Sequence, residues 1–473
     1  MNATDTEACY RAVESRDARF AGRFFMGVRT TGIYCRPGCP ARLPKRQNVV
    51  FYPSAAAAEG EGFRACLRCR PNAVPGASAT SGTGATISRA LRLLEETGDA
   101  RGLAERLGVG ERHLRRLFAQ HLGASPSNVL RTRRLHLARQ LLEASSLPMT
   151  EVALSVGFSS LRRFNEAVRE ASGHTPTELR RGSSARAAGD LLELRLPYRA
   201  PIDFTGLLHF LSARAIPEVE RIEGGSWRRA VRMGQLSGVL EVSQRPGHLL
   251  LRVPAQFARA SFALVARVQR LFDLRADPAP IAAHLAKDPL LGPLVRPGLR
   301  VPGAWDPFEM AVRAVLGQQV SVEHARSLAG RLALEQGEPL PQPAPGISRL
   351  FPTAARLAEV ELRGMPKARA RAIRLLAVAV RDGALLLDGA RDLETAVAQL
   401  TALPGIGRWT AEVIALRALG EPDAFPAGDL GLRRSSNLDE RALLSRAEAW
   451  RPWRGYAALL LWMHESGGSN GVD

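Results

Sequence analysis

Cysteine and lysine are scarce and unevenly placed in this chain of 473 residues. All five cysteines lie within the first 69 residues, and the only lysines are Lys45, Lys287 and Lys367. Thiols gathered in this way argue against a disulfide framework and favour a metal site or reactive thiols. The basic surface must consist of arginine, whose planar fork suits phosphates and guanine edges, although a coding bias toward arginine would produce the same composition.

Long apolar runs are also missing. No stretch is long enough to span a membrane, and the first residues, MNATDTEACYR, lack the basic and apolar segments of a signal peptide. We therefore expect a bacterial cytoplasmic protein. The chain is too long for a single hydrophobic core and predicts three or four domains.

Acidic side chains are outnumbered by basic ones, 46 against 65, which gives a formal net charge of +19. The first 189 residues hold 29 basic and 16 acidic side chains, so most of the excess lies there. Such a surplus favours a polyanionic partner through counterion release, but it does not identify the partner.

Stretches of small residues at 74–85 and 183–189 lack apolar periodicity and are predicted to be linkers. Between them the apolar spacing is helical throughout. From about residue 190 the pattern alternates, as in LLELRLPY and HLLLRVP, which predicts strands, and helical spacing resumes near residue 260. The predicted domains are residues 1–73, 86–182, 190–298 and 299–473.

Four of the cysteines, Cys35, Cys39, Cys66 and Cys69, form a C-x3-C and a C-x2-C pair. Four thiolates at this spacing can surround one Zn²⁺ tetrahedrally, so a zinc site is predicted. Ligand spacing alone favours a purely structural zinc knuckle. The flanking sequence RTTGIYCRPGCPAR and the residues up to Cys69, however, closely resemble the amino-terminal domain of the Ada-type adaptive-response protein.

The Ada resemblance implies that Cys35 is both a zinc ligand and a nucleophile. It would accept a methyl group, once only, from a methyl phosphotriester in DNA. Zinc keeps thiols deprotonated, and the thiolate is the attacking species. Methylating one of four thiolates changes the charge of the site from about −2 to about −1, which weakens repulsion from DNA phosphates. The hypothesis is that repair switches on DNA binding.

Two helix-turn-helix patterns occupy residues 100–123 and 149–181, with glycine at each turn. Two such units joined by a long helix resemble the AraC-type DNA-binding domain, whose recognition helices enter successive major grooves. A helical bundle with solvated arginines is the alternative. The residues expected to contact DNA are Arg112, Arg115, Arg116, Arg162 and Arg163.

The segment LPGIGRWTA at 403–411 is a helix-hairpin-helix pattern, in which Gly405 and Gly407 allow backbone N–H groups to face a phosphate. Alone it could be a non-specific DNA clamp. Together with residues 301–321, Asp429 and residues 450–462, it resembles the AlkA-type 3-methyladenine DNA glycosylase over nearly all of 190–465.

The glycosylase resemblance implies roles for individual residues. Asp429 would stabilise the developing oxocarbenium sugar, although a helix N-cap after Gly428 is the structural alternative. Trp409 and Trp462 would stack on the flipped cationic base, although tryptophans at helical spacing are more often core.

Several positions bear on how this resemblance is interpreted. Trp409 stands where related lyases carry a Schiff-base lysine, so a monofunctional enzyme is expected. The absence of cysteine after residue 69 excludes the iron–sulfur cluster of some relatives. Gln319 stands where a relative has an apolar wedge, and Val413 replaces a pocket tyrosine.

The predicted fold class is multidomain: a small zinc-bound α/β domain, an all-α paired helix-turn-helix domain, an α+β small antiparallel-sheet domain and an all-α helix-hairpin-helix domain. The predicted function is excision of alkylated purines, fused to a methyl phosphotriester-sensing regulator. A regulator whose last third only binds damaged DNA is the alternative, and a glycosylase merely delivered by its front modules is another. The expected partners are alkylated and promoter duplex DNA, RNA polymerase and Zn²⁺, with no membrane, no nucleotide cofactor and association with the nucleoid.

Overall fold

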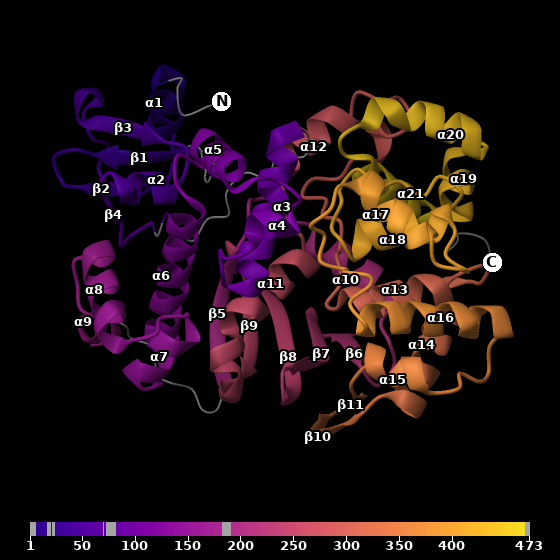
Figure 1. Cartoon of the computed structure of the whole chain (residues 1–473). Helices are drawn as coiled ribbons and strands as arrows, with labels where there is room; N and C mark the ends of the chain where they lie inside the picture. Colours follow the sequence, from indigo (N-terminus) through magenta and orange to yellow (C-terminus); the bar gives the residue numbers. More distant parts are fainter. Residues whose placement is uncertain are drawn as a thin grey trace. The chain divides into compact units, whose positions relative to one another are not determined.

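The computed structural model describes residues 6–16, 20, 24–69, 71, 82–181 and 191–468. The chain forms two compact units (Figure 1). The first comprises residues 1–200, 245–266 and 274–276, and the second comprises residues 201–244, 267–273 and 277–473. None of the helices in the described ranges is long and apolar enough to cross a membrane.

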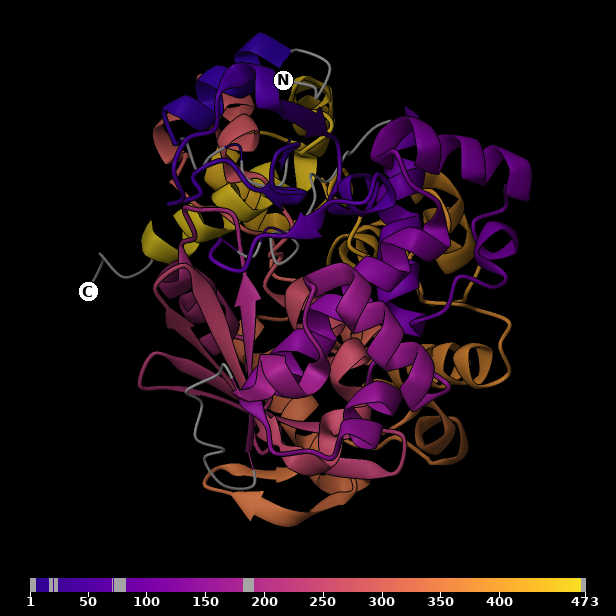
Figure 2. The same ribbon diagram turned by 90° about the vertical axis from the view of Figure 1, so that its left-hand side faces the viewer.

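The first unit begins with a small four-stranded sheet in the order β3-β1-β2-β4, the indigo part of Figures 1 and 2. Strand β1 pairs antiparallel with β2 and β3, whereas β2 and β4 are parallel. Buried side chains of helix α1 pack with the four paired cysteines in one core. The elements are α1 (Thr6–Glu14), β1 (Phe25–Val28), β2 (Ile33–Cys35), η2 (Arg46–Asn48), β3 (Val49–Tyr52), α2 (Ala55–Gly60) and β4 (Arg64–Ala65).

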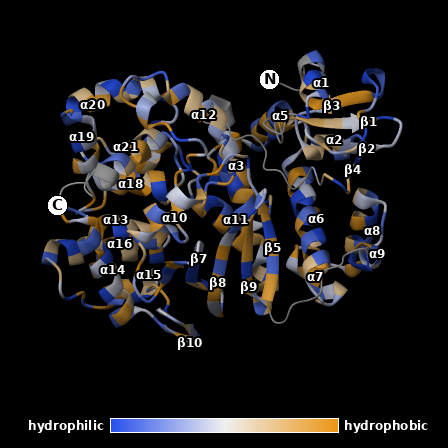
Figure 3. Ribbon diagram, turned by 180° about the vertical axis from the view of Figure 1, so that it is seen from behind, coloured by the Kyte–Doolittle hydropathy of each residue, from blue (hydrophilic) through white to orange (hydrophobic). Residues whose placement is uncertain are grey.

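Helices α3 to α9 follow, and in Figure 3 those that are labelled carry hydrophobic and hydrophilic residues side by side, as amphipathic helices do. Gly108 and Gly157 make the two turns with positive φ, 68° and 84°, which glycine adopts without steric cost. The helices are α3 (Gly82–Thr97), α4 (Leu103–Arg106), α5 (Glu111–Leu122), α6 (Pro126–Ala144), α7 (Met149–Ser155), α8 (Leu161–Ser172) and α9 (Pro176–Arg181).

One linker prediction is wrong in part. Helix α3 begins at Gly82, so residues 82–85 of the predicted linker 74–85 are helical, because the apolar spacing of the helix already starts with Ile87 buried. The rest of that linker, 74–81, and the linker 183–189 lie outside the described residues.

Strand β5 (Leu191–Pro197) pairs antiparallel with β9 (His248–Pro254) in the first unit, next to η4 (Ala255–Ala260). Buried and exposed residues alternate along β5, as the sequence predicts. The backbone N–H of Arg195 donates to Oε1 of Gln140 on α6 at 3.0 Å, so a helix covers this edge of the sheet.

The second unit contains an antiparallel meander of β6, β7 and β8, a short hairpin and many helices. Its core is built mainly from α13, α14, α16 and α18. The elements are α10 (Phe204–Ser212), β6 (Glu220–Glu223), β7 (Ser226–Met233), β8 (Leu236–Arg245), α12 (Pro278–Leu285), η5 (Gly292–Leu294), α13 (Pro307–Leu316), α14 (Val322–Gln336), β10 (Pro339–Ala344), β11 (Ile347–Arg349), α15 (Ala354–Glu359), α16 (Lys367–Arg381), α17 (Leu393–Thr401), α18 (Arg408–Arg417), α19 (Leu430–Ser436), α20 (Glu440–Ala447), η6 (Glu448–Trp450) and α21 (Arg454–Gly468). Helix α11 (Ser261–Leu271) is divided between the two units after residue 266.

These elements confirm the predicted fold class of a small cysteine-bearing α/β domain, a helical domain, antiparallel strands and a final helical domain.

Candidate functional site

The thiol groups of Cys35, Cys39, Cys66 and Cys69 lie close together. Their Sγ atoms all lie within 4.8 Å of one another, and all four residues are buried. Parallel pairing of β2 with β4 aligns Tyr34 with Ala65, and the N–H of Cys66 donates to the carbonyl of Tyr34 at 3.0 Å. One Zn²⁺ with Zn–S bonds of about 2.3 Å fits such a group of four sulfur atoms.

The thiols of this cluster perturb one another strongly. Hydrogen bonds with Cys39, Cys66 and Cys69 raise the pKa of the Cys35 thiol, and Cys35 in turn lowers the pKa of the Cys39 thiol to about 7. The sulfur atoms are so close that protonation of one favours ionisation of its neighbour. A divalent cation allows all four to be thiolates, because it supplies the compensating charge.

A half-buried carboxylate, Glu59, joins the cysteine module, residues 24–69, to the helical domain. The hydroxyl of Tyr34, the residue before Cys35, donates to Glu59 Oε1 at 2.8 Å, and the hydroxyl of Thr132 on α6 donates to its other oxygen. Burial raises the pKa of the Glu59 carboxyl, and the two donors counteract that effect. Ser54 adds a hydrogen bond from its Oγ to the carbonyl of Leu122, the last residue of α5, at 2.5 Å.

The recognition helices α5 and α8 present the predicted DNA-binding arginines to solvent. Their buried faces consist of apolar residues, so the arginines occupy the opposite faces. Arg115 and Arg162 make i,i+4 pairs with Glu111 and Glu166, which are exposed and therefore weak. The exposed set is Arg112, Arg115, Arg116, Arg162 and Arg163.

The predicted hairpin lies between α17 and α18, and its two glycines differ. Gly405 has φ +88°, and a Cβ added there would lie 2.6 Å from Cβ of Ala372. Gly407 has φ −84° and nothing within 4 Å of an added Cβ. The turn therefore requires glycine only at residue 405, whereas Gly407 leaves space in front of the N-terminus of α18.

Replacing Gly405 with alanine should destabilise the protein by about 1–3 kcal/mol and weaken binding of undamaged duplex DNA, because the hairpin must move away from α16. Gly407→Ala is the matched control for stability, since its backbone and surroundings accept a methyl group. Thermal unfolding compares the two variants, and fluorescence anisotropy compares the DNA affinity of Gly405→Ala with that of the wild type. Equal stability of the two variants would contradict the argument.

Asp429 meets both predicted pocket tryptophans. Nε1 of Trp409 donates to Oδ2 of Asp429, and Nε1 of Trp462 donates to Oδ1, both at 2.9 Å. Oδ1 also accepts from the N–H of Leu432 at 3.1 Å, so Asp429 is the N-cap of α19 as well. The carboxylate thus makes both the N-cap contact and the indole contacts. A helix N-cap and a role in the glycosylase site are therefore compatible interpretations of Asp429. Val413, one turn after Trp409, is buried.

Gln319 lies in the loop between α13 and α14. It is exposed and has φ +55°, a backbone conformation that residues other than glycine rarely adopt. Its neighbour Gln318 donates from Nε2 to the carbonyl of Gly405 at 2.9 Å and to Oγ1 of Thr410 at 3.0 Å. These two hydrogen bonds hold the loop against the hairpin, a role for Gln318 that no local pattern in the sequence indicates.

Two further residues near the site, Phe210 on α10 and Arg214 just after it, were not predicted from the sequence. The Cζ atom of Arg214 lies 3.8 Å from the ring centroid of Phe210. Burial lowers the pKa of the Arg214 guanidinium to about 10, while the nearby charges of Asp429 and Glu465 counteract that shift. The only sequence signal for this group is the run FLSAR within a segment matched as a whole to the glycosylase.

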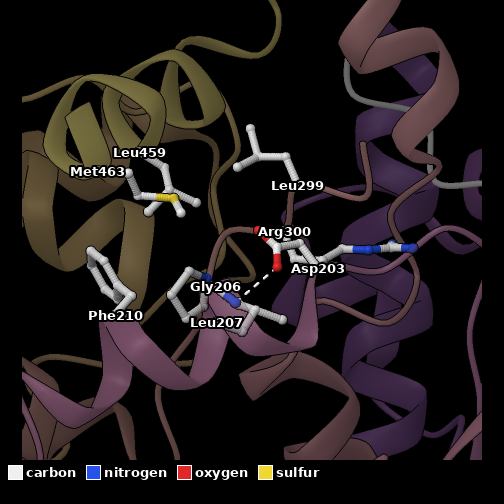
Figure 4. A pocket seen from close by; sticks show the side chains of 9 residues that line it. Asp203, Gly206, Leu207, Phe210, Leu299, Arg300, Leu459 and Met463 are labelled. Carbon is white, nitrogen blue, oxygen red and sulfur yellow. Dashed lines mark hydrogen bonds between the residues drawn. The ribbon is translucent and has the colours of Figure 1, made fainter. Parts of the chain in front are cut away.

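A cavity beside Phe210 is visible in Figure 4, between α10 and α21. Its volume is about 10 Å³, enough for roughly one water molecule but not for a purine. Asp429 and the two tryptophans are not among its lining residues. The cavity is therefore not the base pocket.

Three family models match the chain. They are the metal binding domain of Ada over residues 8–72, a helix-turn-helix domain over 103–182 and the AlkA N-terminal domain over 193–306. The first of these, together with the four-cysteine cluster, confirms the predicted zinc cofactor.

Several curated proteins are similar to the chain. A "probable bifunctional transcriptional activator/DNA repair enzyme AlkA" of Mycobacterium tuberculosis is 44% identical, with 97% of this chain and 96% of that protein covered. The DNA-3-methyladenine glycosylase 2 of Escherichia coli is 36% identical, with 57% of this chain and 96% of that protein covered. The bifunctional transcriptional activator/DNA repair enzyme Ada of the same species is 35% identical over 37% of this chain and 48% of that protein.

A solved structure shares the fold of the last part of the chain. A 3-methyladenine DNA glycosylase from Archaeoglobus fulgidus matches with a TM-score of 0.51 and 22% identity, covering 58% of this chain and 99% of that one.

Proposed function

This chain belongs to the AlkA family of bifunctional transcriptional activators and DNA repair enzymes, a DNA glycosylase fused to a regulator, and we propose that its glycosylase excises alkylated purines such as 3-methyladenine and 7-methylguanine. The observation that carries the proposal is the hydrogen bonding of Trp409 and Trp462 to the two oxygens of Asp429. An acidic group held between two electron-rich rings suits a flipped, positively charged base.

In the proposed reaction the protein supplies one carboxylate and needs no acid to protonate the leaving base. N-alkylation makes the purine a cation and a good leaving group, so the C1′–N bond breaks with its electron pair moving to the base. Asp429 stabilises the oxocarbenium sugar that remains and orients the water that attacks it. A Schiff base at residue 409 is impossible because tryptophan has no amine, so we expect release of the base without strand cleavage.

For the zinc module we propose that Sγ of Cys35 attacks the methyl carbon of a DNA methyl phosphotriester. The new S–C bond forms as the C–O bond breaks, and the phosphate leaves as an ordinary diester anion. A bound Zn²⁺ would keep the thiolate unprotonated and would be held by Cys35, Cys39, Cys66 and Cys69. The product is a thioether, so each molecule reacts once.

Methylation also removes one negative charge close to DNA. We propose that this change strengthens binding through the exposed arginines of α5 and α8, namely Arg112, Arg115, Arg116, Arg162 and Arg163, and that the bound form recruits RNA polymerase. Promoter affinity that is the same before and after methylation of Cys35 would favour front modules that only deliver the glycosylase.

The proposal is tested by incubating the full chain with N-methylated duplex DNA and identifying released bases by chromatography. Release of 3-methyladenine or 7-methylguanine supports it. If DNA binds but no base is released, the last third is a damage-binding module and the regulator is the primary function.

Gln319 is proposed to fill the gap left by the flipped base. Gln319→Ala should lower release of 7-methylguanine from duplex DNA by about tenfold, because the opened stack is no longer supported, and should change release from single-stranded DNA much less. Initial rates on the two substrates give the comparison. An equal loss on both would contradict a role in the duplex.

A further inference from the structure

A second carboxylate lies beside Asp429. Gly431, in the first turn of α19, has Oδ1 of Asp429 and Oε2 of Glu465 on the same side: a Cβ added there would lie 3.1 Å from the first and 2.5 Å from the second. Glu465 belongs to α21, three residues after Trp462, whose indole N–H reaches the same Asp429 oxygen. Two acidic side chains from different helices therefore pack against one α-carbon.

This approach depends on the missing side chain at residue 431. Any Cβ would overlap the Glu465 carboxylate, which is the far end of a flexible side chain and would turn away. The neighbouring backbone would not need to move. Glycine at residue 431 thus permits, at little structural cost, the short distance between Glu465 and Asp429.

Two arginines, Arg434 and Arg214, lie near Glu465 and differ in how far solvent screens them. Nη1 of Arg434 lies 3.7 Å from Oε1 of Glu465, but the side chain of Arg434 is 66% exposed, so water and salt screen this pair. Arg214 is closer to the interior, and its pKa responds to the charges of both Asp429 and Glu465. Because the two carboxylates lie on the same side of Gly431, the field of Glu465 reaches Asp429.

A negative charge near the reacting sugar affects the binding of cationic bases more than that of neutral bases. A base alkylated on a ring nitrogen is a cation, and so is the oxocarbenium ion formed as it leaves, whereas many other damaged purines are neutral. An additional negative charge attracts the cations and leaves neutral bases almost unaffected, with a strength that depends on distance and local dielectric. Asp429 alone would provide less of this discrimination.

We propose that Glu465 is a specificity-determining residue of the glycosylase site, whose carboxylate beside Asp429 increases the preference for cationic over neutral ligands. The proposal rests on the function proposed above. It assigns no bond-making role to Glu465, because the cleavage itself needs only one carboxylate.

The test compares two DNA duplexes that differ only in charge at the abasic position. One carries a pyrrolidine analogue, a protonated ring that mimics the oxocarbenium sugar, and the other carries a neutral tetrahydrofuran. For the full-length protein we expect Glu465→Gln to lower the ratio of the two affinities by about fivefold, with tetrahydrofuran binding unchanged. Gly431→Ala, whose methyl group displaces the Glu465 carboxylate and also crowds Oδ1 of Asp429, should lower the ratio in the same direction.

Glu335→Gln is the matched control, because Glu335 is an exposed residue of α14 that carries the same charge. An unchanged ratio in Glu465→Gln, or an equal loss of affinity for both duplexes, would overturn the proposal, since the second result indicates a structural role. The binding ratio does not require catalysis. If the wild type releases no base, the proposed function fails, while the ratio still decides whether Glu465 selects cations.

Discussion

Replacing Asp429 with asparagine should lower release of 3-methyladenine and 7-methylguanine by about a thousandfold, the size of effect seen when a preorganised electrostatic group is removed from a transition state. Asparagine has the same shape and keeps an oxygen that can accept from the N–H of Leu432, so α19 should remain capped. What changes is the negative charge opposite the forming oxocarbenium ion, together with the hydrogen bond from Nε1 of Trp409, which an amide NH₂ cannot accept. Single-turnover rates on methylated duplex DNA measure the loss directly.

The control for this variant is Asp439→Asn. Asp439 caps the next helix, α20, by accepting from the N–H of Ala442 at 2.8 Å, and it makes no contact with the tryptophans. Its replacement should leave the rate within about twofold of wild type, because only a cap is altered. Base release that survives in the Asp429 variant would show that another group carries the reaction.

Removing zinc should have the second large effect. The four cysteines belong to the same small core as Cys9, Ala12 and Val13 of α1, so the metal and the apolar packing stabilise the same fold. Structural zinc contributes about 10–16 kcal/mol in small domains, more than so small a core can replace. A strong chelator should therefore unfold residues 24–69 and abolish methyl acceptance by Cys35.

The same chelated sample should keep releasing methylated bases, because the chain has no cysteine after residue 69 and no metal is assigned to the glycosylase site. Circular dichroism, the zinc released to an indicator dye and base release can be followed together. Loss of base release on chelation, reversed by added zinc, would contradict independent chemistry in the two parts.

The features that could be predicted from the sequence were those whose evidence is local. The cysteine spacing, the glycines at the two helix-turn-helix turns and the alternation along β5 each depend on neighbouring residues, and the structure contains all three. The linker over 82–85 was predicted from small residues, yet α3 already begins at Gly82. Two of these four residues are glycines, each of which disfavours a helix by about 1 kcal/mol, so the apolar residues that follow, beginning with Ile87, outweigh the local preference.

Only some of the residues and contacts of the candidate site could be predicted from local sequence patterns. Asp429, Trp409 and Trp462 were assigned by resemblance, and their mutual hydrogen bonds join positions 20 and 33 residues apart. Gln318 fastens its loop to Thr410, 92 residues away, and Glu465 approaches Asp429 only because residue 431 has no side chain. Contacts of this kind depend on packing between helices, and no local pattern in the sequence announces them.

The bridge from Tyr34 through Glu59 to Thr132 has a consequence for protein engineering. The cysteine module, residues 24–69, transplanted onto another helix-turn-helix domain would carry a half-buried carboxylate with one of its donors missing. Such chimaeras should fold poorly unless the threonine of α6 is transplanted as well. The segment to transfer is therefore the cysteine module together with helix α6. A boundary placed between the two would separate Glu59 from Thr132, one of its two hydrogen-bond donors.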